Sequence, residues 1–382
     1  MQSTGRQSSH DAYHEPHPKA LHTHPRHQDP EFDERIHSAA HRQLWVVTAI
    51  SNPVRFKTRY ALYKKFRHHV TRELGLPLIT VEAAYGDRDF QVTDDGLEDA
   101  VLTSTLDNGV RTVDVRVRNE SQVWLKENLW NIGARYLPRE CKYVMFADAD
   151  IEFMNPHIAT EIVHALQEYR VIQPFETAAD MGPQGQIMDV HRSFGWCYAN
   201  GWQWRPEADG SGGYTAKRPS DVPRPVGFGN PWHPGFAVAM RRSVLDKMAF
   251  LDIGVLGAGD HHMMGALIGQ APLTLPKKIH PNYRKAVLAW QARAAKVVKR
   301  DLGFAPGTIV HNFHGAKANR KYVSRWDILV LFQFDPEADV YRNAQGVLEL
   351  ESHKPELRDA IRRYFRQRNE DGLEMVGSPA RA

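Results

Sequence analysis

Apolar strands alternate with amphipathic helices from residue 44 onward, and this alternation constrains the fold more than any other feature. The strand-like runs are LWVVTAIS at 44–51, PLITVEAAY at 77–85, VRTVDVRVRN at 110–119 and KYVMFADAD at 142–150. The segments between them, 52–74 and 121–137, place aromatic and aliphatic residues at helical spacing. This pattern predicts an α/β fold, with one mostly parallel, Rossmann-like sheet, right-handed connections and helices on both faces.

The first 43 residues differ in composition from the rest of the chain. They hold eight of the 20 histidines, several prolines and almost no aliphatic residues. Such a segment cannot bury enough apolar area to offset the entropy lost on ordering, so we predict that residues 1–43 form a disordered tail. The irregular spacing of the histidines favours a solvated tail over a metal-binding segment.

The composition of the 382 residues indicates a globular protein without a membrane span. No window approaches about 18 consecutive apolar residues, and the first residues lack the apolar core of a secretory signal. Two cysteines, Cys141 and Cys197, are too few for a disulfide framework, so we expect reduced thiols that pack in the core. We therefore expect a cytoplasmic protein. Its net charge of +4 suits an anionic ligand such as a nucleotide.

The alternation of strands and helices becomes less regular after residue 150. A helix at 156–169 and a strand at 170–175 precede a Gly- and Pro-rich segment at 176–235. A long segment without periodicity predicts a lid or a binding loop. Its tryptophans would either stack on a ligand or pack within the lid, and they are Trp196, Trp202, Trp204 and Trp232. Residues 284–300 predict a basic amphipathic helix.

Two aspartates, Asp148 and Asp150, end the strand at 142–150. Side chains alternate along a strand, so both carboxylates are expected to point the same way at the carboxyl edge of the sheet, where α/β folds bind ligands. Three interpretations compete: a polar strand end, the nucleophile of an aspartyl phosphatase, and a divalent cation that holds a nucleotide diphosphate. The phosphatase pattern has a hydroxyl residue two positions later, where this chain has Glu152.

The order of these motifs resembles the GT-A fold glycosyltransferases. VVTAISNP in the first strand, LKENLWNIGA in a helix and then YVMFADADIEF are similar to the nucleotide-sugar-binding half of that family, and the resemblance covers about residues 44–335. It implies that Asp148 and Asp150 hold Mn²⁺ or Mg²⁺ against the donor diphosphate. The other donor-binding residues that it implies are Thr48, Ala49, Ile50, Glu82, Lys126 and Asn131. For Lys126 the alternative is a solvated helix face.

The stretch from Trp232 to Leu267 is similar to the acceptor-binding half of the family. It contains PGFAVAMRR and a GAGDHH turn before a helix. The resemblance implies that Asp260 contacts the acceptor hydroxyl and acts as the general base in inverting members, although Asp260 could equally be the N-cap of that helix. The residues expected around the acceptor are Trp232, Gly235, His261 and His262.

A later stretch, HNFHGAKANRKY at 311–322, carries histidines followed by cations. In the family a histidine near the carboxy-terminal end often completes the metal site, and a following lysine reaches the diphosphate. The resemblance implies His314 as the third metal ligand, with His311 as the alternative, and Lys317 and Arg320 at the phosphates. The spacing departs from the His-x-x-Gly-x-x-Lys form of retaining members, which leaves the ligand and the stereochemical outcome open.

These motifs predict a single GT-A-like domain with a donor half at 44–150, an acceptor half at 151–335 and a helical extension at 336–382. The expected activity is metal-dependent transfer of a hexose or pentose from a nucleoside-diphosphate sugar to an acceptor hydroxyl. GDHHM with HGxxxNRxY resembles bacterial and tailed-phage enzymes, which implies a glycan or a hydroxymethylated pyrimidine in DNA as acceptor. A nucleotidyltransferase of similar fold and a non-catalytic carbohydrate- or DNA-binding protein are the alternatives.

Overall fold

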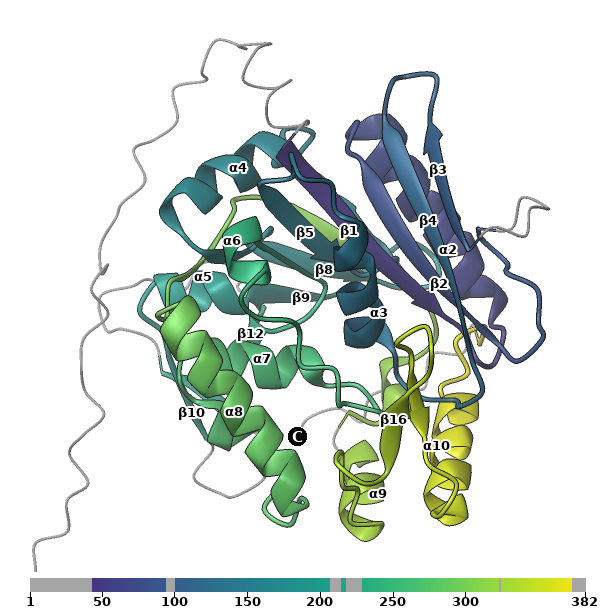
Figure 1. The fold of residues 1–382 in the computed structure, drawn as a ribbon. Helices are drawn as coiled ribbons and strands as arrows, with labels where there is room; N and C mark the ends of the chain where they lie inside the picture. Colours follow the sequence, from purple (N-terminus) through teal and green to yellow (C-terminus); the bar gives the residue numbers. More distant parts are fainter. Residues whose placement is uncertain (1–42, 94–99, 207–213, 218–228, 323, 373–382) are drawn as a thin grey trace, which may run out of the picture.

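The computed structural model describes residues 43–93, 100–206, 214–217, 229–322 and 324–372 (Figure 1). The tail expected at residues 1–43 lies outside the described residues except for Gln43. Within the described ranges, no helix has the length and apolar character needed to cross a membrane.

The large sheet has eight strands and includes the four that the first half of the sequence predicts. In spatial order they are β14 (Leu302–Phe304), β7 (Val171–Gln173), β13 (Ala237–Arg241), β5 (Tyr143–Ala147), β1 (Leu44–Ser51), β2 (Leu78–Tyr85), β4 (Arg111–Asn119) and β3 (Val101–Thr105). Strands β13 and β3 run antiparallel to their neighbours, whereas β1, β2, β4 and β5 pair in parallel, as do β7 and β14. The predicted α/β class with a mostly parallel sheet is confirmed.

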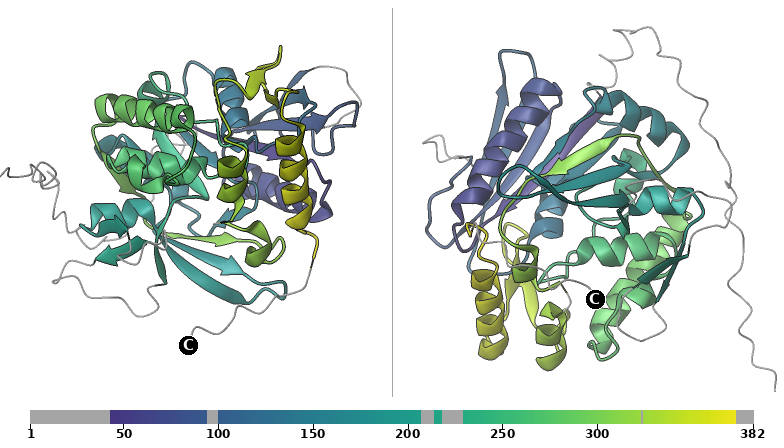
Figure 2. Two further views of the ribbon diagram at one scale, coloured as in Figure 1. Left: turned by 90° about the horizontal axis from the view of Figure 1, so that it is seen from below. Right: turned by 180° about the vertical axis from the view of Figure 1, so that it is seen from behind.

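Helices cover both faces of this sheet because the side chains of its central strand alternate. Trp45 and Val47 of β1 share a core with α3 (Lys126–Gly133), whereas Leu44 and Val46 share the opposite core with α2 (Lys57–His68) and α4 (Ile158–Glu168). Figure 2 shows α2 in front when the molecule is seen from behind. Each face therefore buries its own apolar layer, and this sheet needs no partner chain to cover it.

The remaining helices lie mostly in the second half of the chain. They are α5 (Phe194–Ala199), α6 (Arg242–Leu245), α7 (Gly259–Leu267), α8 (Pro281–Val297), α9 (Arg325–Leu331) and α10 (Pro355–Gln367), with the shorter turns η1 (His69–Glu73), η2 (Ala134–Tyr136), η3 (Ala271–Thr274) and η4 (Lys317–Arg320). Helices α9 and α10 stand side by side in Figure 1. The carboxy-terminal extension, expected to be helical, also contains a hairpin of β16 (Val340–Arg342) and β17 (Leu348–Leu350).

A second sheet corrects the lid predicted at 176–235. In spatial order its strands are β12 (Asn230–His233), β9 (Ile187–Ser193), β8 (Thr177–Met181), β15 (Thr308–His311) and β6 (Ile151–Phe153), and a hairpin of β10 (Gln203–Pro206) and β11 (Tyr214–Lys217) lies outside it. Strand β9 begins with exposed residues. It therefore lacks the continuous buried apolar run by which a strand is recognised in the sequence. Residues 207–213 and 218–228 of the predicted lid lie outside the described part of the chain.

Asp148 and Asp150 lie in the turn between the two sheets. Strand β5 ends at Ala147 and β6 begins at Ile151, so the expectation that both carboxylates project from one extended strand is wrong. The backbone amide of Asp148 donates to a carbonyl just before β13, and the carbonyl of Asp150 accepts from the segment after β15. Because the chain passes here from one sheet to the other, the two carboxylates meet different neighbours.

Candidate active site

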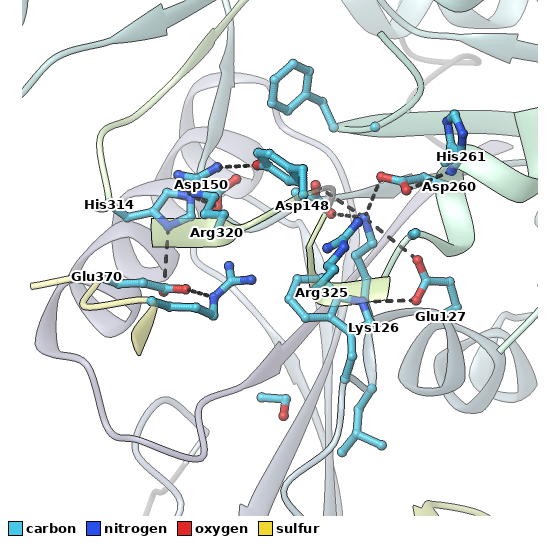
Figure 3. Close-up of a pocket in the computed structure, with 18 of the residues that line it drawn as sticks. Lys126, Glu127, Asp148, Asp150, Asp260, His261, His314, Arg320, Arg325 and Glu370 are labelled. Carbon is cyan, nitrogen blue, oxygen red and sulfur yellow. Dashed lines mark hydrogen bonds and ion pairs between the residues drawn. The ribbon is translucent and has the colours of Figure 1, made fainter. Parts of the chain in front are cut away.

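A cavity of about 940 Å³ lies beside the turn that joins the two sheets (Figure 3). Its wall is built from the starts of α3 and α7, the segment after β15 and residues that follow α10. The predicted site residues that line it are Ala49, Ile50, Lys126, Asp148, Asp150, Gly235, Asp260, His261, His311, His314, Lys317 and Arg320.

Three residues expected at the donor lie outside the cavity wall, because their polar groups have partners within the fold. Glu82 accepts hydrogen bonds from the backbone amides of residues 91–93. The hydroxyl of Thr48 donates to a backbone carbonyl of β5 at 2.9 Å. The side chain of Asn131 donates to the carbonyl of Phe250 at 3.1 Å and accepts from its amide at 2.8 Å. These residues stabilise the scaffold behind the site.

Two residues expected at the acceptor are also packed away from the cavity. Trp232 is 7% exposed, and its ring meets that of Phe194 at a centroid distance of 4.7 Å. His262 is fully buried, with Nδ1 2.6 Å from the Thr274 hydroxyl and Nε2 3.1 Å from that of Tyr283. Trp196, Trp202 and Trp204 are buried in the same core cluster as Trp232, which favours packing over stacking on a ligand.

One half of the cavity, which we call the lysine side, consists of Lys126, Glu127, Asp148 and Asp260 (Figure 3). The ammonium nitrogen of Lys126 lies 3.1 Å from Asp148 Oδ1, 3.6 Å from Asp260 Oδ2 and 3.9 Å from Glu127 Oε1. The Lys126 side chain is 14% exposed, so it does not lie on a solvated helix face. The Lys126 ammonium group thus contacts three carboxylates from different parts of the fold: Asp148 in the turn after β5, Glu127 on α3 and Asp260 on α7.

Burial and these neighbours shift the pKa values on the lysine side. Burial alone lowers the pKa of Lys126, but Asp148 and Asp260 outweigh it and raise that pKa above its ordinary value. Burial raises the pKa of Asp148 to about 6 and that of Glu127 to about 7. For Asp260, burial is outweighed by Lys126 and Arg325, and the pKa falls to about 2. Asp260 is therefore an ionised carboxylate at neutral pH.

Asp260 does not cap α7. The N-cap position is Ala258, whose φ of 73° lies in the left-handed region. The Asp260 carboxylate accepts from the amide of His261 at 2.8 Å and otherwise faces Lys126 and the cavity. A Cβ atom at Gly235 would lie 2.8 Å from Asp260 Oδ2, so glycine at position 235 leaves room for this carboxylate.

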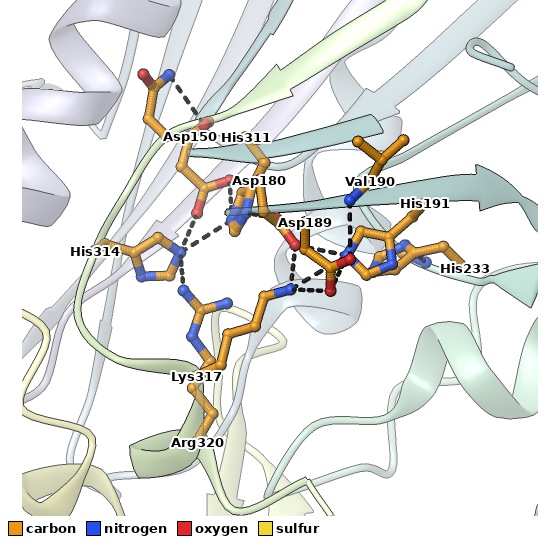
Figure 4. A network of polar contacts seen from close by, with 12 residues as sticks. Asp150, Asp180, Asp189, Val190, His191, His233, His311, His314, Lys317 and Arg320 are labelled. Atoms are coloured by element: carbon orange, nitrogen blue, oxygen red, sulfur yellow. Dashed lines mark hydrogen bonds and ion pairs between the residues drawn. The ribbon is translucent and has the colours of Figure 1, made fainter. Parts of the chain in front are cut away.

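The other half, which we call the histidine side, consists of Asp150, Asp180, His191, His311 and His314 (Figure 4). His314 Nε2 lies 3.0 Å from Asp150 Oδ2, and His311 Nε2 lies 3.8 Å from Asp150 Oδ1. The two Nε2 atoms are 3.2 Å apart. His311 and His314 thus both converge on Asp150, whereas the sequence treated them as alternatives.

Asp150, His311 and His314 fit a divalent cation. Ligand atoms about 2.1 Å from an ion and at right angles to one another are about 3.0 Å apart, close to the two shorter separations here. Asp150 Oδ1 is buried and accepts no hydrogen bond within the described structure. Of the predicted set of Asp148, Asp150 and His314, the last two lie in this group with His311, whereas Asp148 pairs with Lys126.

A second group in the described residues, Asp180, Asp189 and His191, has the spacing of metal ligands but already contains a cation. The ammonium nitrogen of Lys317 lies 3.2 Å from His191 Nε2 and 3.4 Å from Asp189 Oδ2, and it contacts Asp180. Lys317, expected at the phosphates, thus occupies this group. His191 is contacted on its other side by the ring of His233, at a centroid distance of 4.8 Å.

Several residues of the cavity were not predicted from the sequence. Asp180 lies on a strand inside the segment that was interpreted as a lid, and Arg325 and Glu370 come from the carboxy-terminal part, where no motif singled them out. Glu370 is 1% exposed and pairs with Arg59 and Arg368. No sequence motif marks an acidic residue such as Glu370, and its burial between two arginines is seen only in the folded structure.

No family model matches the chain, and no curated protein matches it. Among solved structures, 45 chains match. One is a putative nucleotide-diphospho-sugar transferase from Desulfovibrio desulfuricans, with 12% identity over 84% of this chain and 96% of that one and a TM-score of 0.28.

Two further structures have similar scores. A mutant of Drosophila β1,4-galactosyltransferase 7 in complex with manganese, UDP-galactose and xylobiose has 10% identity over 83% of this chain and 98% of that one, with a TM-score of 0.31. A 4-diphosphocytidyl-2C-methyl-D-erythritol synthase from Anaerococcus prevotii has 11% identity over 72% of this chain and 90% of that one, with a TM-score of 0.32. TM-scores this low do not assign a function to this chain. The assignment rests on the geometry of the site.

Proposed function

We propose that this chain is a metal-dependent transferase that moves a sugar from a nucleoside-diphosphate sugar to an acceptor hydroxyl. The arrangement of the cavity carries the proposal. On the histidine side Asp150 joins two imidazoles in a group that fits a cation. On the lysine side Asp260 supplies an ionised carboxylate that faces the same cavity. A cation for a diphosphate and a base for a hydroxyl are the two groups that such a transfer needs.

Asp150, His311 and His314 would hold the cation, which we propose to be Mn²⁺. Imidazole nitrogen suits first-row transition metals, whereas Mg²⁺ prefers an all-oxygen shell. When bound, the ion neutralises charge that grows on the departing nucleoside diphosphate. Arg320, which is 7% exposed and lies 2.9 Å from His314 Nε2, adds a fixed positive charge next to that position.

In an inverting transfer, the acceptor oxygen bonds to the anomeric carbon while the bond to the diphosphate breaks. The acceptor proton passes to the Asp260 carboxylate. Lys126 orients that carboxylate by ion pairing at 3.6 Å, and Gly235 leaves space in front of it. The Lys126 side chain is 14% exposed and that of Asp260 30%, and this partial burial strengthens the contact between them.

The acceptor that we propose is a carbohydrate. Trp124, Tyr322 and Trp326 line the cavity, and aromatic faces stack on sugar rings. The basic helix α8, a surface that could contact a DNA acceptor, does not line the cavity in its described residues, and its Lys285 pairs with Glu337 at 3.0 Å. Loss of acceptor-dependent turnover with rising salt on hydroxymethylated DNA would favour DNA instead.

A panel of nucleotide sugars, incubated with the protein in the presence of Mn²⁺ or of EDTA, tests the proposal. We expect release of one particular nucleoside diphosphate with Mn²⁺ and none with EDTA. Full activity in EDTA would contradict the metal requirement. Release of pyrophosphate from a nucleoside triphosphate would indicate a nucleotidyltransferase, and donor binding without turnover would indicate a non-catalytic binding protein.

A further inference from the structure

Each imidazole that faces Asp150 has a buried carboxylate behind its other nitrogen. Asp180 Oδ1 lies 2.6 Å from His311 Nδ1 (Figure 4), and Glu370 Oε2 lies 3.6 Å from His314 Nδ1 (Figure 3). Asp180 is 3% exposed and Glu370 is 1% exposed. The two carboxylates come from β8 and from the segment after α10. Asp180 is within hydrogen-bond distance of His311, whereas Glu370 is an ion-pair neighbour of His314, whose Nδ1 has no hydrogen-bond partner in the described structure.

The hydrogen-bond partners of the rings determine which nitrogen faces the cation group. A carboxylate can only accept, so His311 donates from Nδ1 to Asp180, and in the neutral ring the lone pair is on Nε2. An arginine can only donate, and Arg320 lies 2.9 Å from His314 Nε2. Asp150 Oδ2 lies 3.0 Å from the same nitrogen and can only accept, so His314 Nε2 faces one donor and one acceptor, while Nδ1 faces Glu370. Both rings thus direct Nε2 to Asp150.

Both carboxylates are themselves held in place. Asp180 also accepts from His191 Nε2 at 2.6 Å through its second oxygen, which Lys317 contacts as well. Glu370 accepts from Arg59 at 2.9 Å and from Arg368 at 2.6 Å. A carboxylate fixed by two further partners cannot swing away from the imidazole behind which it lies, so the ring orientation is set before any ion arrives.

We propose that Asp180 and Glu370 are positioning residues that present the Nε2 atoms of His311 and His314 to a cation bound at Asp150. This inference rests on the proposed function, since it assumes the metal assignment. Neither carboxylate touches the ion. Each acts through its imidazole by fixing the tautomer and orientation and by increasing the basicity of Nε2, as carboxylates behind metal-bound histidines do.

The test is a titration of Mn²⁺ into the full-length protein, followed by electron paramagnetic resonance, which detects the free ion. For Asp180→Asn we expect binding weaker by about 10- to 100-fold. Glu152→Gln is the matched control, because it removes the same charge from β6, where Glu152 bonds Asn312 and Lys65 and contacts neither imidazole. Its Mn²⁺ affinity should equal that of the wild type. Unfolding of each variant in EDTA shows whether the fold is retained.

A second readout separates positioning from a general loss of structure. Nitrogen modulation in the electron spin echo of bound Mn²⁺ reports coordinated imidazole, and Asp180→Asn should reduce it at saturating metal. Glu370→Gln provides an independent variant on the other ring. If the wild type binds Mn²⁺ and both variants match it in affinity and modulation, the positioning role is overturned and the proposed function stands. If the wild type binds no Mn²⁺, the metal assignment fails and both proposals fail with it.

Discussion

The lysine side and the histidine side place two aspartates, one residue apart, in opposite electrostatic environments. Burial raises the pKa of Asp148 to about 6, and the charges of Asp150 and Asp260 act in the same direction against Lys126. Burial acts on Asp150 as well, but His314 and His311 outweigh it and hold its pKa well below the ordinary range. On the lysine side an ammonium group contacts the aspartate directly, whereas on the histidine side two imidazoles face Asp150, with Arg320 beside His314. Neighbouring positions in an Asp-x-Asp motif need not have the same role.

The broadest expected effect comes from Asp150→Asn, because this variant removes the only carboxylate from the candidate metal group and should change both metal binding and turnover. We expect Mn²⁺ binding to be lost and donor turnover to fall by about 100- to 1,000-fold, the range seen when a main electrostatic contact of a transition state is removed. Titration of the metal and release of nucleoside diphosphate measure the two effects. Asp148→Asn should retain Mn²⁺ binding. Equal loss of Mn²⁺ binding in both variants would show that both aspartates hold the ion, which contradicts the different roles proposed for Asp148 and Asp150.

Asp260→Asn tests the lysine side. We expect transfer to the acceptor to fall by about 100- to 10,000-fold, the usual contribution of a general base, while Mn²⁺ affinity stays at the wild-type value. The amide cannot accept the proton, but it retains the shape that fits beside Gly235. Rates with acceptor and Mn²⁺ titrations together check this. Undiminished transfer in the variant would remove Asp260 from the chemistry and leave the metal site untouched.

The pH dependence of stability should differ in sign between the two aspartates. The folded protein binds the Asp148 proton more tightly than the unfolded chain does, so this group lowers the free energy of unfolding as the pH rises from about 4 to 6. Asp148→Asn should therefore gain stability relative to the wild type across that window, by on the order of 2 to 3 kcal/mol. Urea unfolding in EDTA at several pH values measures it.

Asp150→Asn is the opposite case in the same experiment. Its folded pKa is depressed, so the wild-type carboxylate contributes stability that is present above about pH 4 and is lost as the pH falls. The variant should be less stable than the wild type at neutral pH, and the difference should shrink in acid. Parallel pH profiles for the two asparagine variants would show that the two sides do not differ electrostatically.

The sequence predicts the central strands of the large sheet well because they are buried on both faces. Strands such as β1 and β2 are continuous apolar runs, which a buried parallel strand requires. The second sheet escaped prediction because its strands are short or partly exposed, and β9 opens with two exposed residues, Ile187 and Met188, before a polar stretch. Periodicity therefore identified the scaffold and missed the sheet that supplies Asp180 and His191.

The candidate site was predictable in its residue types but not in its grouping. The resemblance pointed to Asp150, Asp260 and His314, and all three line the cavity. It could not show that Asp148 pairs with Lys126 while Asp150 faces two imidazoles, because these pairings depend on where the chain turns between the two sheets. Contacts between residues far apart in sequence, such as Glu370 behind His314, have no local pattern at all.

The smallest expected effect comes from Trp232→Phe, which lies on neither side of the cavity. The Trp232 ring packs against Phe194 and Trp204, and its Nε1 makes no hydrogen bond within the described structure. Phenylalanine keeps an aromatic contact and removes an unsatisfied donor, so only ring volume is lost and the free energy of unfolding should fall by about 1 to 2 kcal/mol. Acceptor KM and Mn²⁺ affinity should not change. A raised acceptor KM without any loss of stability would show instead that this ring reaches the acceptor, and the residues that contact substrate would then extend beyond the lysine and histidine sides.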